Sequence, residues 1–339
     1  MDISGNQGHF GGGFYCISSD STNIDRTSFR NNTSETGGAI YCVASSPLIK
    51  NTKIINNTAD VGGGLYIIEN SHPILQNVEI SENIALDDVL GGGAILSYQS
   101  NPTLINTTII YNSAVKKGGG LYSIGSDPIL INTIMWDNSP EEIFLHEWSI
   151  YPNTITTLYC DISGGEEGVI SNVYDTIFWL EGNIDEDPLF VGGWEHPYAI
   201  SKGSPCKDAG TPDTAGLFLP VKDIDGGPRI WNNRIDIGAY EWNNVGFEDR
   251  QTFVSDLRIQ TYPNPFTDNL TIEFGQMQSG NITLTLLNQL GQQVAVLFSG
   301  NWQDGTFSFD VDGSRFPSGI YLIRLQAGDR TSVKKIVKW

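Results

Sequence analysis

A repeat of about 26 residues limits the possible folds of this chain more than any other feature of its sequence. Glycine-rich strings such as GGAIYC and GGGLYI recur, beginning at Gly11, Gly37, Gly62, Gly91 and Gly118. A proline-led string follows at a fixed offset, and its prolines (47, 73, 102 and 128) are separated by 26, 29 and 26 residues. The longer step contains a three-residue insertion at Asp87–Leu90. A period of this length indicates stacked units that cannot bury a core alone.

The apolar residues of each repeat alternate with polar ones, within short runs bounded by Gly, Pro or Asn. They form three columns: Phe14, Ile40, Leu65, Ile95 and Leu121; Ile49, Leu75, Leu104 and Leu130; and Phe29, Ile54, Ile80, Ile109 and Met135. Alternation in such runs is typical of strands. Because neighbouring coils pair as parallel strands and parallel crossovers are right-handed, we predict that residues 1–150 form a right-handed parallel β-helix.

Asparagines recur at two corners of the predicted coil. They are Asn51, Asn77, Asn106 and Asn132 at one corner, and Asn32, Asn57, Asn83, Asn112 and Asn138 at the other. Stacked amides can donate and accept hydrogen bonds from coil to coil, so we expect these residues to be structural.

The rest of the chain departs from this register. Residues 151–245 are rich in turns and acidic residues, which predicts terminal coils and a cap over the last open coil. Residues 246–256 form a polar linker without periodic apolar residues. From residue 257 to 339, about seven alternating runs separated by Gly or Asp turns predict a small antiparallel β-sandwich. The whole chain is therefore expected to be all-β.

Charge and hydropathy exclude several classes of partner. The chain holds 39 acidic and 19 basic residues, a formal charge of −20. Net repulsion of phosphate argues against nucleic acid or an anionic membrane surface as a partner. No apolar run reaches the roughly 18 residues of a membrane helix, so we expect no membrane span. The first residues also lack the pattern of a signal peptide, so the chain is either cytosolic or lacks its export signal.

Three motifs near the end of the chain carry a family resemblance. They are YPNPFTDNLTIEF (Tyr262–Phe274), LLNQLGQQV (Leu286–Val294) and FPSGIYLIRL (Phe316–Leu325). In this order they resemble the type A C-terminal sorting domain of the type IX secretion system of Bacteroidetes. The resemblance implies that residues 257–339 are recognised by the secretion machinery and removed on export, and that the protein is secreted or held at the outer-membrane surface. The signal peptide is then absent from this chain because its beginning is incomplete.

Two further resemblances concern the preceding region. Residues 180–242, through GNIDEDPLF and RIDIGAYEW, are similar to the terminal segment of choice-of-anchor repeat proteins. The solenoid resembles pectate-lyase-like β-helices and, through its GGAI strings, polymorphic outer-membrane adhesins. These likenesses rest on corner residues and imply a fold without a function.

Catalysis on such a solenoid would need a base beside clustered carboxylates, or two carboxyls. Glu82 and Asp137 share a column two coils apart, with Tyr111 between them. Their separation of about 9.6 Å by stacking would suit an inverting hydrolase, but solvated rim charges are the simpler interpretation.

A row of tyrosines is the candidate ligand surface. Tyr15, Tyr41, Tyr66 and Tyr122 each follow an inward apolar residue, so alternation directs them outward, with Leu96 interrupting the row. Flat rings with polar edges suit sugar rings, so this row is a candidate glycan platform. A ladder that only stabilises the sheet is the alternative.

Two further sites follow from residue type. The acidic loops supply the oxygen ligands that Ca²⁺ prefers, and the candidate ligands are Asp185, Asp187, Asp223 and Asp225. Hydrated loops are the alternative. Among four cysteines, Cys160 and Cys206 flank the cap and are expected to form a disulfide if the protein is exported.

The leading hypothesis is therefore an exported, surface-associated β-helix protein that binds glycans or neighbouring surfaces, as an adhesin does, without chemistry of its own. The competing hypothesis is a polysaccharide lyase or glycoside hydrolase with a groove on the flank of the solenoid. A purely structural stalk is the third.

Overall fold

The computed structural model describes residues 1–147, 150–192, 196–232, 234–243, 258–262, 264–276, 280–288, 291–302, 305–327 and 330–339. The chain divides into two compact units. The first comprises residues 1–191 and 198–243, and the second residues 192–197 and 244–339. The predicted linker at 246–256 lies outside the described residues.

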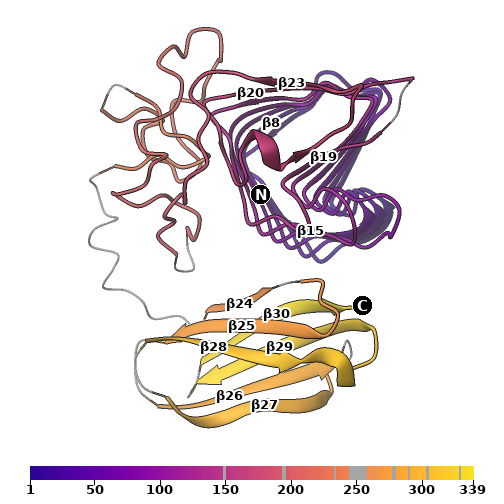
Figure 1. The fold of residues 1–339 in the computed structure, drawn as a ribbon, viewed down its shortest axis with the longest axis vertical. Helices are drawn as coiled ribbons and strands as arrows, with labels where there is room; N and C mark the ends of the chain where they lie inside the picture. Colours follow the sequence, from indigo (N-terminus) through magenta and orange to yellow (C-terminus); the bar gives the residue numbers. More distant parts are fainter. Residues whose placement is uncertain are drawn as a thin grey trace. The chain divides into compact units, whose positions relative to one another are not determined.

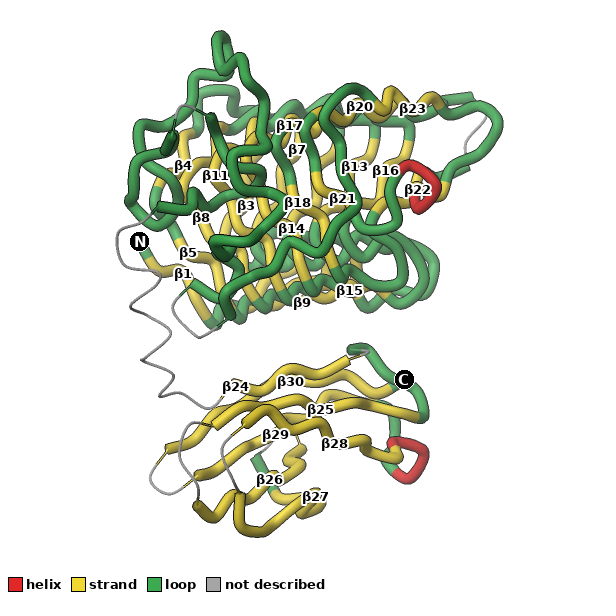
Figure 2. Tube along the Cα trace, turned by 60° about the vertical axis from the view of Figure 1, so that its left-hand side comes forward, coloured by secondary structure: helices red, strands yellow, loops and turns green. Residues whose placement is uncertain are grey.

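The first unit is a parallel β-helix with three sheets, as predicted (Figures 1 and 2). Sheet A contains β1 (Asp2–Ser4), β4 (Asn23–Asp25), β5 (Ser28–Arg30), β8 (Leu48–Ile55), β11 (Ile74–Ser81), β14 (Thr103–Ile110), β17 (Ile129–Ile131), β18 (Ile134–Trp136), β20 (Thr154–Leu158), β21 (Asp161–Ile162) and β23 (Thr176–Trp179). Sheet B contains β2 (Gln7–Phe10), β6 (Thr33–Thr36), β9 (Thr58–Val61), β12 (Ile84–Ala85) and β15 (Ser113–Ala114). Sheet C contains β3 (Phe14–Ile17), β7 (Ile40–Val43), β10 (Leu65–Ile68), β13 (Ile95–Tyr98), β16 (Leu121–Ile124), β19 (Ile143–Leu145) and β22 (Val169–Ile170). The short 3₁₀ turn η1 (Glu166–Gly168) precedes β22.

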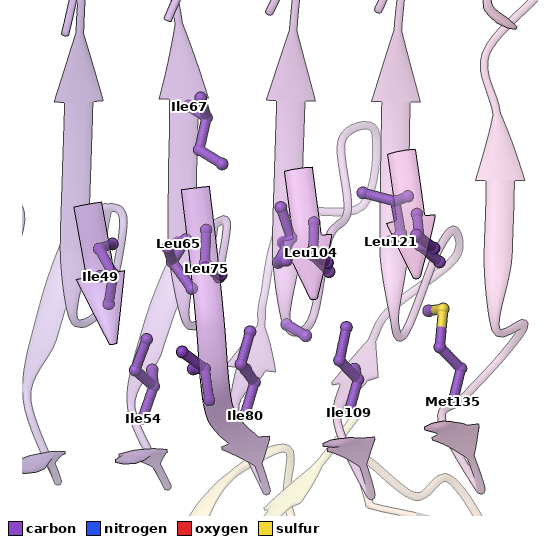
Figure 3. Packing of buried hydrophobic residues seen from close by; sticks show 14 of the residues in the cluster. Ile49, Ile54, Leu65, Ile67, Leu75, Ile80, Leu104, Ile109, Leu121 and Met135 are labelled. Atoms are coloured by element: carbon purple, nitrogen blue, oxygen red, sulfur yellow. The ribbon is translucent and has the colours of Figure 1, made fainter. Parts of the chain in front are cut away.

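The predicted apolar columns form the core of this unit (Figure 3). Ile80 is in register with Ile54 on one side and Ile109 on the other, and all three are fully buried. The glycine corners permit this close stacking. A Cβ atom on Gly63 would lie 2.5 Å from the carbonyl oxygens of Gly93 and Ile84, so no larger residue fits there.

The predicted asparagine ladder is also confirmed. The backbone N–H and the side-chain amide of Asn57 both donate to Oδ1 of Asn83, each at 2.9 Å. The same pair of bonds links consecutive members of the series Asn6, Asn32, Asn57, Asn83, Asn112 and Asn138. The ladder ends on a carboxylate, because Asn138 donates from its backbone to Glu142 Oε1 (3.0 Å) and from its side chain to Oε2 (2.5 Å).

A second ladder runs along another corner and was not predicted from the sequence. Each backbone N–H donates to the side-chain oxygen of the next coil at 2.8 to 3.2 Å, in the order Ser19, Ser45, Ser71, Ser100, Ser126, Asn153 and Asp175. This ladder also ends on a carboxylate, that of Asp175. Both ladders therefore direct their donors toward the last coils, and each ends on the carboxyl group of a side chain.

The prediction that residues 151–245 end in a cap over the last coil is wrong for residues 198–243, which we call the flank segment. They lie along the outer face of sheet A instead of across the last coil (Figure 1). The segment bonds to several coils: Gln76 donates to Leu217 O at 2.7 Å, and Ala239 N donates to Thr108 Oγ1 at 3.0 Å. Phe178, in the last strand of sheet A, remains 49% exposed. The flank segment forms little regular secondary structure, so its backbone N–H and C=O groups use side-chain amides and hydroxyls on this face of sheet A as hydrogen-bond partners.

The other predicted asparagine column bonds both to neighbouring coils and to the flank segment. Asn51, Asn77, Asn106 and Asn132 all adopt left-handed backbone angles with φ of 49° to 53°. Asn77 donates to Asn51 Oδ1 (3.1 Å), as expected for a ladder, but also to Lys222 O in the flank segment (2.8 Å). This column therefore anchors the flank segment as well as the coils.

The second unit is the predicted antiparallel sandwich of seven strands. One sheet contains β24 (Arg258–Tyr262), β25 (Asn269–Gln276) and β28 (Gly305–Asp312). The other contains β27 (Gln293–Trp302), β26 (Gly280–Asn288), β29 (Gly319–Ala327) and β30 (Arg330–Lys338), with the turn η3 (Gly313–Arg315) after β28. Side chains of both sheets share one core that includes Ile272, Leu284 and Ile323. Within the described residues, the structure has no helix with the length and apolar character needed to cross a membrane.

Candidate functional site

The candidate site is an open groove on the flank of the solenoid. Its volume is about 810 Å³, and it lies between the loop Pro220–Gly226 of the flank segment and the corners of two early coils, residues 25–28 and 50–53. We call it the flank groove. On the solenoid side, the lining residues Asp25, Ser28, Lys50, Asn51 and Lys53 belong to β4, β5 and β8, and Arg26 and Thr27 form the corner between β4 and β5.

Asp223 fixes the conformation of the loop. Its Oδ1 accepts from the backbone N–H of Asp225 (3.2 Å) and Gly227 (2.8 Å), and its Oδ2 accepts from that of Glu241 (2.9 Å). Burial raises the pKa of this carboxyl, although the bond from Glu241 opposes the shift. The loop therefore presents a defined wall to the groove.

Lys53 joins the groove to a buried polar cluster. Its Nζ lies 3.4 Å from Glu79 Oε2 and donates to the hydroxyl of Tyr240 at 2.9 Å. The Tyr240 hydroxyl in turn donates to Glu79, and both of these side chains are 1% exposed. Burial raises the pKa of Tyr240 well above its usual value, with the Glu79 charge adding to the shift. Tyr240 therefore remains a neutral phenol that attaches the flank segment to sheet A.

A buried ion pair supports the segment from behind. Arg229 Nη2 lies 2.7 Å from Glu241 Oε2, and Nη1 donates to the carbonyl oxygens of Gly238 (3.2 Å) and Ala239 (3.1 Å). Glu241 Oε1 also accepts from the backbone of Trp231 at 2.7 Å. Because both charges are buried and bonded, they hold the flank segment in one conformation.

The candidate carboxyl pair Glu82 and Asp137 lies outside the flank groove, and each carboxyl is hydrogen-bonded by a tyrosine. Glu82 accepts from the hydroxyl of Tyr198 at 2.8 Å. Asp137 is hydrogen-bonded by Tyr111, whose ring packs against that of Tyr198 with centroids 5.9 Å apart. Desolvation raises the pKa of Asp137, and the bond from Tyr111 opposes it. Both carboxyls therefore already accept a hydrogen bond from a tyrosine hydroxyl.

The tyrosine row points outward and stacks, but most of it is covered. Ring centroids are 5.4 Å apart for Tyr15 and Tyr41 and 5.2 Å apart for Tyr41 and Tyr66. Tyr15 is 45% exposed, whereas Tyr41 is 8% exposed and Tyr122 fully buried. Tyr122 packs in a small outer cluster and bonds His146 at 2.7 Å. Burial raises the pKa of Tyr122 to about 12. The open part of the expected platform is therefore limited to Tyr15 and its neighbourhood.

The candidate Ca²⁺ ligands are dispersed over separate loops. Asp185 accepts from Gly164 N at 3.1 Å, which joins its loop to the turn 21 residues earlier, and Asp187 accepts from Leu189 N at 2.9 Å, which closes a local turn. Asp223 and Asp225 line the flank groove. Across the described ranges, no three His, Cys, Asp or Glu side chains are grouped as metal ligands. Calcium at these loops stays a prediction.

The expected disulfide between Cys160 and Cys206 is wrong. Both are free cysteines, on opposite faces of sheet A. Cys160 packs in the solenoid core, whereas Cys206 lies on the outer face and donates to Asp161 Oδ2 at 2.9 Å. Alternation along the chain directs residues 160 and 161 to opposite faces, which separates the two thiols.

The cluster around Lys53 was not predicted from the sequence. Lys53 and Glu79 are partners in the register of adjacent strands, so a search for opposite charges one period apart would have found them. The contributions of Tyr240 and Lys222 carried no such signal, because the flank segment has no period.

Comparisons with known families agree with this architecture. Residues 1–183 match the sequence model of the right handed beta helix region, and the chain belongs to this family. Residues 260–339 match the secretion system C-terminal sorting domain, which places the protein among type IX secretion substrates that reach the cell surface or the medium and interact with the secretion machinery. A comparison with curated proteins gives no match.

Proposed function

We propose that this protein binds glycans at the cell surface, in an adhesin-like role, and does not cleave them. The observation that carries the proposal is the flank groove, whose volume of about 810 Å³ is in the range of ligand-binding sites. Its walls hold hydroxyl, amide and charged groups, among them Ser28, Asn51 and Lys53. Hydroxyl and amide groups donate to and accept from sugar hydroxyls, and a lysine ammonium donates to them.

One observation favours the competing function, a polysaccharide lyase or glycoside hydrolase. Lys53 lines the groove and contacts both a carboxylate and a phenol, the groups from which a lyase builds its base. However, Glu79 and Tyr240 are buried and bonded to each other, so Lys53 alone would reach a sugar. Its Nζ is already engaged by the Glu79 carboxylate and the Tyr240 hydroxyl, so Lys53 is suited to donating hydrogen bonds to a ligand. Binding without cleavage is therefore the better supported function.

The test is to apply the full chain to an array of neutral and acidic glycans, and to assay the same glycans for released reducing ends and for a rise in absorbance at 235 nm. We expect retention on the array and no turnover. Turnover would replace the proposal with the lyase or hydrolase. Absence of retention on every glycan would refute glycan binding altogether.

A further inference from the structure

The geometry points to a negatively charged glycan, bearing carboxylate or sulfate groups, as the ligand of the flank groove, with Arg26, Lys50 and Lys222 as its binding cations. This inference rests on the proposed function and adds the chemical class of the ligand. These three cations differ from the other charges of the chain in their position and in their availability to a ligand.

Positive charge is concentrated at the groove. The chain has a formal charge of −20, and residues 1–243 hold only eleven Lys and Arg residues. Four of those eleven line the groove: Arg26, Lys50, Lys53 and Lys222. Three aspartates line it as well, but Asp223 is already bonded to three backbone N–H groups. An acidic surface repels polyanions, so a basic groove within it is the place where they can bind.

Three of the four cations are available to a ligand. Lys53 is committed to Glu79 at 3.4 Å. Lys50 and Lys222 have no ion pair with any residue in the described part of the chain, and Lys222 is exposed. The side chain of Arg26 is 81% exposed, and its Nε is 4.0 Å from Asp25 Oδ1, a distance too long for a hydrogen bond.

Arg26 lines the groove from a corner of the coil. Arg26 occupies the coil corner that Asn51, Asn77, Asn106 and Asn132 occupy in the following coils, and its φ is 49°. Asparagine tolerates this left-handed conformation, whereas arginine is disfavoured there. The same left-handed conformation occurs at other coil corners, for example at Ala44 (φ 46°) and Tyr111 (φ 54°), so it follows from the geometry of the corner. A guanidinium at this corner gains the bidentate recognition of a carboxylate or sulfate that an amide cannot supply.

The experiment compares two matched triple variants of the full chain. R26Q/K50Q/K222Q removes the three available groove cations. R30Q/K116Q/K202Q removes one arginine and two lysines that do not line the groove, so both variants change the net charge equally. Binding of polygalacturonate, dextran sulfate and neutral dextran is measured by calorimetry at two salt concentrations, after thermal melts have shown that both variants fold.

For the wild type, we expect salt-sensitive binding of at least one polyanion and none of dextran. The groove variant should bind about tenfold more weakly, and the control variant within about twofold of the wild type. Comparison of polygalacturonate with dextran sulfate distinguishes carboxylate from sulfate. Equal losses in both variants would show unspecific attraction and overturn the inference. Binding of neutral glycans alone would also overturn it while leaving the proposed function intact, whereas failure to bind any glycan would refute both.

Discussion

Replacement of Asn83 by alanine tests whether the buried amide ladder stabilises the solenoid. Asn83 is fully buried in the middle of the ladder. Its Oδ1 accepts from the backbone of Asn57 at 2.9 Å, and its Nδ2 donates to Ile54 O at 2.8 Å. Alanine would leave the Asn57 N–H without this acceptor and the Ile54 carbonyl without this donor. Because each unsatisfied buried group costs about 1–3 kcal/mol, we expect N83A to lower the free energy of unfolding by about 2–5 kcal/mol.

Urea denaturation followed by far-UV circular dichroism measures this change. The matched control is Asn6, which makes the same donor contacts to Asn32 at the exposed end of the ladder. N6A should change stability by less than about 0.5 kcal/mol, since water replaces the lost amide. The reasoning would be refuted if N83A cost no more than N6A, because burial of the amide would then contribute nothing.

Three other predictions concern the first unit. R229M should lower the free energy of unfolding by about 3–5 kcal/mol, because it leaves the Glu241 carboxylate buried without its cation. The double variant R229M/E241Q should recover part of that loss. Equal urea midpoints for the single and double variants would contradict this prediction. Burial raises the pKa of Glu142 to about 8 and that of Asp161 to about 7, so the folded state binds protons that the unfolded chain has released. Stability should therefore fall as the pH rises from about 5 to about 8, and a rise in urea midpoint over that range would show the opposite. The four cysteines should react with a thiol reagent only after unfolding, and added reductant should leave the melting temperature unchanged.

The solenoid could be predicted from the sequence because each coil determines which way its own residues face. Ile54 points inward by local alternation, and the repeat length then places Ile80 and Ile109 beside it. The asparagine ladder follows from the same spacing. For these residues, information within one period of the chain is sufficient.

The position of the flank segment could not be predicted in this way. Tyr240 bonds to Glu79 across 161 residues of sequence, and no period connects them. The burial of Tyr122 depends likewise on what covers it, an outer cluster that includes Leu96 and Phe144. An outward direction is fixed by alternation, but exposure is decided by segments that pack later, so the tyrosine row was found and its accessibility was not.

The hydrogen bonds that link successive members of the two polar ladders all run in one direction along the solenoid axis, and each ladder has a definite end. Every step of the asparagine ladder uses the same donors and the same acceptor, so a whole coil can be gained or lost between Asn6 and Asn138 without leaving a buried amide unpaired. The length of the solenoid can therefore change in increments of one coil. Each series ends on a side-chain carboxyl, that of Glu142 in the asparagine ladder and that of Asp175 in the other, which accepts the last bonds. Beyond these two residues the stack continues through backbone pairing, as between β20 and β23, so duplications that preserve the ladder bonds as well are confined to the coils before them.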